Sequence, residues 1–261
     1  MIPSYHITSW REKAPWPSDD QIEQDLIIER SLVEIFSDDF LRERLAFRGG
    51  TALHKLYLKP QIRYSEDIDL VQIKAESFGP TIDRLKERLS FLGEPRRNQK
   101  KHNNTLIFRV QGESGSQLRL KVEVNCREHF AIQGFQDYNL KVESEWFKGE
   151  AMLKTYTLEE LLATKLRALY QRKKGRDLFD LWHASSLAKV DIDTVIDTWQ
   201  TYMKKEGNSA SRKKFTLNVE EKMNDDLFQG DMKSLLRPDS TYKQEHAFDF
   251  FMKHYLTKIP E

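Results

Sequence analysis

Hydrophobic positions recur at helical spacing in the first part of the chain. Apolar side chains between residues 22 and 36 follow Ser18-Asp-Asp-Gln21, which has the form of a capping box, and this pattern predicts a helix. A second helix is predicted from about Asp38 to Ala46, and a third over Pro80–Leu92. Residues 1–17 contain three prolines and two tryptophans, so we expect an irregular arm there.

The middle of the chain alternates between apolar and polar residues instead. The alternation runs through residues 104–111 and again through 118–125, with a Gly- and Ser-rich turn between the two runs. Two alternating runs joined by a short turn predict a β-hairpin. In the second run Leu118, Leu120, Val122 and Val124 face inward, and Arg119, Lys121, Glu123 and Asn125 face outward.

The pattern becomes helical again from Ala151. Thr157-Leu-Glu-Glu160 has the form of a second capping box, and leucines recur after it at helical spacing. We therefore expect an α+β fold, with a first domain over residues 1–150 that contains a small mixed sheet. A helical C-terminal domain is expected over residues 151–261.

Composition narrows the class of protein. No run approaches the roughly 18 to 20 apolar residues that a membrane span needs, and the N-terminal residues show no apolar signal region. A single cysteine, Cys126, excludes an internal disulfide and a cysteine zinc site. These features predict a cytoplasmic location.

The net charge of +1 gives no argument for a nucleic-acid partner, but the basic residues are clustered. They gather in Arg96–His102, Lys165–Arg176 and Lys204–Lys214. Such runs are more often solvated surfaces than binding sites. Three of them on one chain nevertheless favour a polyanionic substrate.

Candidate chemistry begins at Gly49-Gly50-Thr51, where a glycine pair precedes a helical pattern. Glycines let the backbone approach a ligand closely, and the N–H groups at a helix N-terminus favour a phosphate. Gly49, Gly50 and Thr51 are therefore candidate nucleotide contacts, and Lys55, one helical turn later, is another. On its own, a Gly-Gly pair is usually only a turn.

Two aspartates follow the turn on a predicted strand. Asp67 and Asp69 are two residues apart, so they lie on one face of that strand at a separation of about 7 Å. Two carboxylates beside a phosphate-binding turn suit a magnesium–nucleotide site. Alone, an Asp-x-Asp pair is usually only a solvated strand end. Together with the Gly-Gly turn it becomes a much more specific signal for a nucleotide site.

The sequence GGTALHK followed by RYSEDIDL resembles the signature motif of the nucleotidyltransferase superfamily with the DNA polymerase β-type catalytic fold. Within that superfamily it resembles the AbiEii/AbiGii abortive-infection toxins. The LKVEV stretch resembles the second block of that family, and the segment from Lys165 to His183 resembles the third. The resemblance implies that Asp67, Asp69 and Glu123 are metal ligands, with Glu123 alternatively a base for the acceptor hydroxyl. It implies that Lys165 contacts the triphosphate, and that one or both of Asp177 and Asp180 hold Lys165 or an arginine, or lie near the active cleft.

The resemblance also implies a function. The protein would be the toxin of a toxin–antitoxin or phage-defence system and would use Mg²⁺, or Mn²⁺ in its place. It would transfer a nucleoside monophosphate from a nucleoside triphosphate to an RNA acceptor, above all the 3′ end of tRNA, and so inhibit translation. An antitoxin encoded nearby would be its partner, with or without stable binding. The alternatives are a nucleotidyltransferase that modifies a protein hydroxyl or a small molecule, and a non-catalytic nucleotide-binding module.

Overall fold

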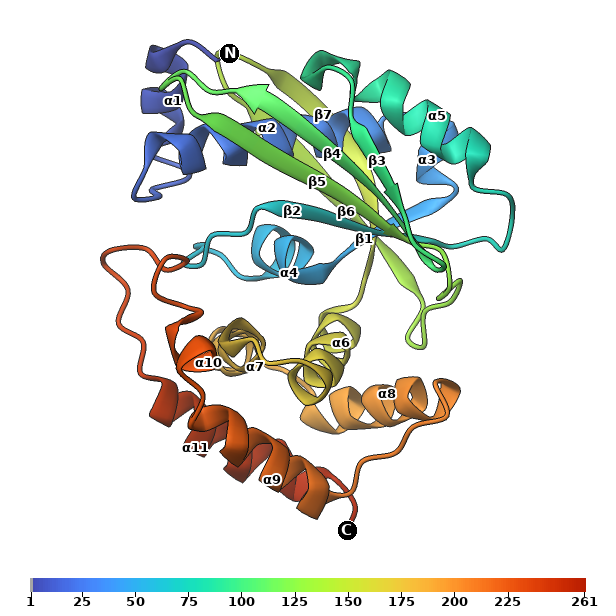
Figure 1. Ribbon diagram of the computed structural model, residues 1–261, viewed down its shortest axis with the longest axis vertical. Helices are drawn as coiled ribbons and strands as arrows, with labels where there is room; N and C mark the ends of the chain where they lie inside the picture. The colour runs from blue at the N-terminus through green and yellow to red at the C-terminus, as the bar shows by residue number, and fades with distance from the viewer. Residues whose placement is uncertain (1) are drawn as a thin grey trace. The chain divides into compact units, whose positions relative to one another are not determined.

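The computed structural model describes residues 2–261, which form two compact units that meet between Tyr156 and Thr157 (Figure 1). The first unit contains every strand of the described chain. The strands are β1 (Leu45–Arg48), β2 (Asp67–Gln72), β3 (Arg96–Gln99), β4 (Asn103–Gln111), β5 (Gln117–Asn125), β6 (Phe135–Glu143) and β7 (Lys148–Tyr156). Its helices are α1 (Ser4–Trp10), α2 (Asp19–Phe36), α3 (Asp39–Arg42), α4 (Gly49–Ala52) with the π-helical turn Leu53–Tyr57, and α5 (Gly79–Arg88) with the 3₁₀ turn Ser90–Leu92.

The strands form one mixed sheet in the order β3-β4-β5-β2-β1-β7-β6. The pairs β2/β5 and β1/β7 are parallel, and the other neighbours are antiparallel. One face is apolar and packs against helices, chiefly α2, which crosses behind the sheet in Figure 1. The short strands β1 and β2 therefore lie at the centre of the sheet, with the Gly-Gly turn directly after β1.

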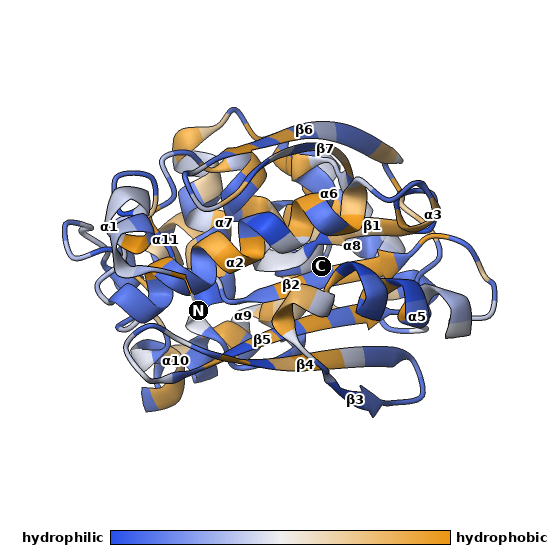
Figure 2. Cartoon of the chain, turned by 90° about the horizontal axis from the view of Figure 1, so that it is seen from above, coloured by the Kyte–Doolittle hydropathy of each residue, from blue (hydrophilic) through white to orange (hydrophobic). Residues whose placement is uncertain are grey.

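The predicted hairpin is present as β4 and β5. Leu118, Leu120, Val122 and Val124 are all buried, so the inward face was assigned correctly. Figure 2 shows the alternation of hydrophobic and hydrophilic residues along these two strands and the hydrophilic character of β3. The predicted first helix is also present as α2, and its capping box joins Ser18 and Gln21 in both directions.

Several expected elements differ from the structure. Residues 1–17 are not an irregular arm throughout, because α1 forms within them, and the expected helix over Asp38–Ala46 ends at Arg42. Leu45, Ala46 and Phe47 instead form the fully buried strand β1. A short apolar run carries no periodicity that separates a strand from a helix, so pairing with β2 and β7 decides its conformation.

The strands β3, β6 and β7 were not predicted at all. Residues from Ala151 to Tyr156 complete β7 rather than open the helical part, which shifts the boundary between the two units. The outer strands β3 and β6 are largely polar, and β3 is exposed along its whole length. Such strands are stabilised by pairing with a neighbouring strand. Their own residues do not alternate clearly between apolar and polar, so the sequence did not predict them.

A buried carboxylate fixes the N-terminal segment on α2. Asp25 accepts hydrogen bonds from the indole nitrogens of Trp10 and Trp16, at 3.0 and 3.3 Å, and from Lys55 Nζ at 2.9 Å. Both tryptophans are buried, and buried indole N–H groups need an acceptor, which the Asp25 carboxylate provides. Tertiary packing therefore orders a segment whose local sequence predicts irregular structure.

The second unit is entirely helical. Its helices are α6 (Leu158–Gln171), α7 (Gly175–Leu187), α8 (Ile192–Lys205), α9 (Arg212–Met223), α10 (Asp226–Gly230) and α11 (Gln244–His254), followed by the 3₁₀ turn Leu256–Lys258. Thr157 caps α6 by accepting from the backbone N–H of Glu160 at 3.2 Å. Across residues 2–261, no helix combines the length and the apolar character that crossing a membrane would require.

Replacement of Asp25 by alanine should destabilise the fold strongly, because two buried indole N–H groups and a buried ammonium lose an acceptor. We expect the free energy of unfolding to fall by about 3–5 kcal/mol, measured by urea denaturation. The exposed Glu12 makes no ion pair in the described chain, so Glu12→Ala is the control and should stay within about 0.5 kcal/mol. Equal effects of the two substitutions would contradict this role for Asp25.

Candidate active site

The Gly-Gly turn and the Asp-x-Asp strand meet at the centre of the sheet. Arg48, the last residue of β1, pairs with Asp69 in the antiparallel register, so Gly49 follows directly beside that carboxylate. Gly49 has a positive φ of 80°, and a Cβ built on it would lie 2.1 Å from Asp69 Oδ2. Only glycine fits this position, for its conformation and for its contact.

The three predicted carboxylates share one face of the sheet. Asp67 and Asp69 alternate with the buried Ile68 and Leu70, and Asp69 pairs with Glu123 in the parallel register of β2 and β5. All three side chains are half-buried. Asp67 Oδ2 accepts from Lys121 Nζ at 3.1 Å, and Glu123 Oε1 accepts from Asn103 at 3.0 Å.

These carboxylates fit a divalent cation by their chemistry. Among residues 2–261, no three His, Cys, Asp or Glu side chains are gathered as a ready-made metal cage. Magnesium does not require one, because it is commonly held by one or two carboxylates together with substrate phosphates. The oxygen donors of Asp67 and Asp69 beside a glycine turn provide that kind of partial site.

The hydroxyl of Thr51 has a different place from the one expected. Thr51 is almost fully buried, and its hydroxyl is bonded to the backbone oxygen of Asp67 and, at 2.7 Å, to Ser65 Oγ. It ties the helix after the turn to the start of β2. The side chain therefore positions the two halves of the motif, which leaves the backbone N–H as the group that Thr51 could offer to a phosphate.

Lys55 is also used inside the protein. It is 4% exposed, and its Nζ lies 2.9 Å from both Asp25 Oδ2 and Glu29 Oε1 of α2. Burial opposes the charged form, but the two carboxylates outweigh it and raise the pKa of Lys55. This position does not suit the expected phosphate contact, because leaving it would abandon two buried carboxylates. The spacing from Thr51 could not reveal that α2 lies on this side of the turn.

A buried ion pair and a buried hydrogen bond near the turn had no signal in the sequence. Arg48 donates to Glu128 Oε2 at 2.7 Å, and both side chains are largely buried. In the loop before β2, Arg63 is 1% exposed and its Nε lies 3.0 Å from His54 Nε2. The first contact joins the end of β1 to the loop after β5, and the second joins the helical segment after the turn to the loop before β2.

In the second unit, Lys165 and the two predicted aspartates come together, one of the arrangements that the family resemblance implied. Lys165 Nζ lies 3.2 Å from Asp177 Oδ1 and 2.7 Å from Asp180 Oδ2, and both aspartates are fully buried. Arg172 adds a two-pronged contact to Asp177, at 2.8 and 2.9 Å. The cluster is thus an internal charge network that fixes the orientation of the Lys165 ammonium group.

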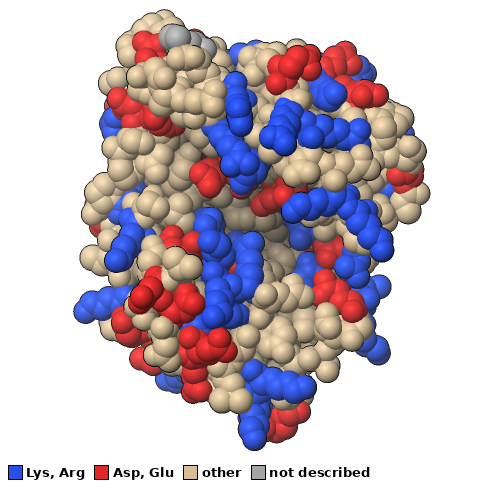
Figure 3. Space-filling model, viewed as in Figure 1, with Lys and Arg blue, Asp and Glu red and all other residues tan. Residues whose placement is uncertain are grey.

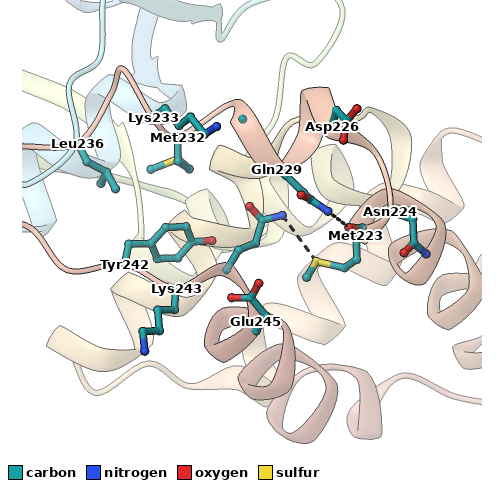
Figure 4. Close-up of a pocket in the computed structure, with 12 residues that line it drawn as sticks. Met223, Asn224, Asp226, Gln229, Met232, Lys233, Leu236, Tyr242, Lys243 and Glu245 are labelled. Carbon is teal, nitrogen blue, oxygen red and sulfur yellow. Dashed lines mark hydrogen bonds between the residues drawn. The ribbon is translucent and has the colours of Figure 1, made fainter.

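The second unit also contains a cavity of about 760 Å³ among its last helices (Figure 4). Tyr242 lines it and packs against Phe179 and Trp182 of α7, the helix that carries both aspartates. The remaining wall mixes amide, acidic, basic and methionine side chains, as Figure 4 shows. The sequence has no motif in this region, and the mixed lining indicates no single class of ligand.

A central mixed sheet with a Gly-Gly turn against an Asp-x-Asp strand defines a nucleotidyltransferase. The sequence matches the family model described as nucleotidyl transferase AbiEii toxin, type IV TA system, over residues 30–254. The chain therefore belongs to the AbiEii family of nucleotidyltransferase toxins, as the sequence motifs implied. The non-catalytic alternative does not agree with this assignment, and an antitoxin partner and a nucleoside triphosphate substrate follow from it.

Solved structures agree with the fold. The nucleotidyltransferase toxin MenT4 of Mycobacterium tuberculosis H37Rv is similar with a TM-score of 0.66 at 18% identity, covering 98% of this chain and 90% of that chain. A crystal structure described as a nucleotidyltransferase from H. pylori has a TM-score of 0.54 at 18% identity, covering 92% and 96%. At this identity the likeness concerns the fold. No curated protein sequence matches the chain.

Replacement of Gly49 by alanine should damage the site more than the fold. The new methyl group would collide with the Asp69 carboxylate, so we expect nucleotidyl transfer to fall at least about tenfold. Gly93→Ala is the matched control, because Gly93 has a φ of 82° but nothing within 4 Å of its Cβ position. Both variants carry the backbone penalty of about 1 kcal/mol, measured by thermal unfolding, and only Gly49→Ala should lose activity. Equal activity of the two variants would contradict the importance of the contact.

Proposed function

We propose that this toxin transfers a nucleoside monophosphate from a nucleoside triphosphate to the 3′ end of tRNA and so inhibits translation. The observation that carries the proposal is the contact of Gly49 with Asp69, which sets a bare backbone turn beside two carboxylates on one strand face. A phosphate chain and a divalent cation are the two groups that such a pair of features binds together.

Gly49 lets the chain turn, and the backbone N–H groups of Gly50 and Thr51 bind the β- and γ-phosphates at the start of the helix that follows. Asp67 and Asp69 hold Mg²⁺, or Mn²⁺ in its place. When bound, the cation neutralises charge on the triphosphate and at the reacting phosphorus. Lys121, which contacts Asp67 on the β5 side, adds a positive charge beside the carboxylates.

Glu123 receives the proton of the acceptor hydroxyl, or else supplies a third ligand to the cation. Its position next to Asp69 supports either role, and Asn103 orients the carboxylate at 3.0 Å. The hydroxyl oxygen bonds to the α-phosphorus while the bond from that phosphorus to the leaving oxygen breaks, and pyrophosphate departs. Positioning and electrostatic stabilisation supply most of the catalysis.

Lys165 adds positive charge to the triphosphate in this proposal. Its salt bridges to Asp177 and Asp180 support a positioning role for the two aspartates, since both hold the ammonium group from one helix. Arg172 shares Asp177, so this network holds the Lys165 ammonium group in one place, from which its charge acts on the triphosphate. The lysine is therefore assigned to binding, and the aspartates to the support of that lysine.

The basic segment Arg96–Lys101 favours an RNA acceptor, because every residue of it is exposed and positive charge attracts the phosphate backbone. The alternative hypotheses are that the acceptor is a protein hydroxyl or a small molecule, and neither acceptor requires a basic surface segment. The cognate antitoxin is proposed to be a separate protein encoded nearby, which need not bind the toxin stably. Phage defence is the setting in which such a pair would act.

Incubation of the protein with Mg²⁺, each α-labelled nucleoside triphosphate and total cellular RNA plus protein should label RNA of tRNA size. Asp69→Asn should lower the label by at least about 100-fold, because it removes one charge from the cation site. The exposed Asp83 of α5 provides the matched control, and Asp83→Asn should keep full activity.

The acceptor atom can be tested in the same assay. Periodate oxidation destroys the 3′-terminal diol of RNA, so oxidised tRNA should accept no label. Label in a protein band would move the acceptor to a protein hydroxyl. Absence of label from every acceptor, or full activity of Asp69→Asn, would contradict the proposed function.

A further inference from the structure

A row of register-paired side chains, two of them basic, crosses the same sheet face as the carboxylates. In the strand register, Arg96 of β3 lies beside Ile107 of β4, Ile107 beside Lys121 of β5, and Lys121 beside Asp67 of β2. Residues that are paired in register point to the same face of a sheet. The row therefore runs across four neighbouring strands and ends at one of the two central carboxylates.

A second pair of cations lies next to this row. Arg109 of β4 and Arg119 of β5 are register partners, two residues along each strand from Ile107 and Lys121. Both arginines are exposed, as is Arg96. Figure 3 shows Lys and Arg side chains gathered over the part of the molecule where Figure 1 draws β4 and β5. We call Arg96, Arg109, Arg119 and Lys121 the basic face.

The guanidinium groups of the basic face have no partner among residues 2–261, unlike nearly all other arginines of the protein. Among residues 2–261, every arginine except Arg96, Arg109, Arg119 and Arg127 contacts a carboxylate, amide or imidazole of the protein through its guanidinium group. Three of the four unpaired arginines thus fall on one surface, beside the carboxylates.

A solvated surface does not explain this arrangement well. Charges on an edge strand protect it from pairing with other chains, and that accounts for Arg96 on β3. Arg109 and Arg119 are on interior strands, where like charges directly opposite one another are destabilising. An anion bound between them would remove the repulsion and use both guanidinium groups, which bind phosphate oxygens in pairs.

The extent of the basic face indicates the size of the anion. Neighbouring strands are about 4.8 Å apart, so the step from β2 to β3 covers about 14 Å, more than a single phosphate occupies. The Gly-Gly turn follows β1, on the other side of β2 from β5. The basic face and the turn therefore flank the carboxylates from opposite sides, and they can serve two different phosphate-bearing molecules.

We propose that the basic face binds the phosphate backbone of the acceptor RNA and directs its 3′ end to Asp67 and Asp69. This inference rests on the proposed nucleotidyl transfer and adds where the acceptor lies. The nucleoside triphosphate approaches from the Gly-Gly turn, and the RNA crosses β3, β4 and β5. Recognition through the backbone carries no base sequence by itself.

The double substitution Arg109→Glu/Arg119→Glu tests the basic face. We expect the KM for tRNA and the dissociation constant for labelled tRNA to rise about 10- to 100-fold, with the KM for the nucleoside triphosphate unchanged. The slope of log affinity against log salt should fall by about two, one for each lost phosphate contact. The matched control is Lys74→Glu/Lys148→Glu, which changes the net charge equally at exposed positions of the same unit outside the basic face, and it should bind tRNA almost normally.

The outcomes separate this inference from the proposed function. If Arg109→Glu/Arg119→Glu leaves the tRNA affinity and its salt dependence unchanged, the RNA-binding role of the basic face is overturned. This holds even if Asp69→Asn abolishes nucleotidyl transfer. Equal losses in the double variant and in its control would also overturn it, since net charge alone would then explain binding. Label transferred to protein instead of RNA would overturn both the proposed acceptor and this role of the basic face. Thermal unfolding of both double variants shows whether either has lost its fold.

Discussion

The structure of the site depends on one close approach, that of the Gly49 backbone to the Asp69 carboxylate. No Cβ fits between them, and the positive φ of Gly49 turns the chain from β1 into the helix that follows. The antiparallel pairing of Arg48 with Asp69 makes this approach possible, and parallel pairing with β5 then sets Glu123 on the other side. A phosphate-binding turn and a set of carboxylates thus become neighbours because of strand order.

Charged residues serve two purposes in this protein, and burial separates them. Lys55 with Asp25 and Glu29, and Lys165 with Asp177 and Asp180, are internal networks in which each charge depends on its partners. Breaking such a network costs far more than its formation contributes, so these groups are held in one arrangement. The arginines of the basic face are the opposite case, because their charges are exposed and remain available to another molecule.

The comparison of the two lysines shows how far a motif can be interpreted. Both were candidates for phosphate binding, one from its spacing after the turn and the other from the family resemblance. Lys55 belongs to the packing of α2, and the spacing along one helix could not show that a second helix carries two acids on that side. For Lys165, the spacing of Asp177 and Asp180 showed only that these aspartates share one side of a helix. Their contact with Lys165 was one of the arrangements that the family resemblance implied.

Local sequence pattern was sufficient to predict the hairpin β4–β5 and the helix α2 with its capping box. It was also sufficient to identify the Gly-Gly turn before Asp67 and Asp69, and the family itself. Periodicity and motifs are properties of residues close together in the sequence, so they can be recognised without the structure. The tertiary structure decided the formation of strand β1 and of the polar outer strands, and the packing of α1 on α2. It also decided the partners of Lys55, Thr51 and Arg48. Each of these depends on a contact between segments far apart in the chain. The sequence therefore determined which groups are available for chemistry, and only the packing of the sheet and helices decided which of them stay accessible to a substrate.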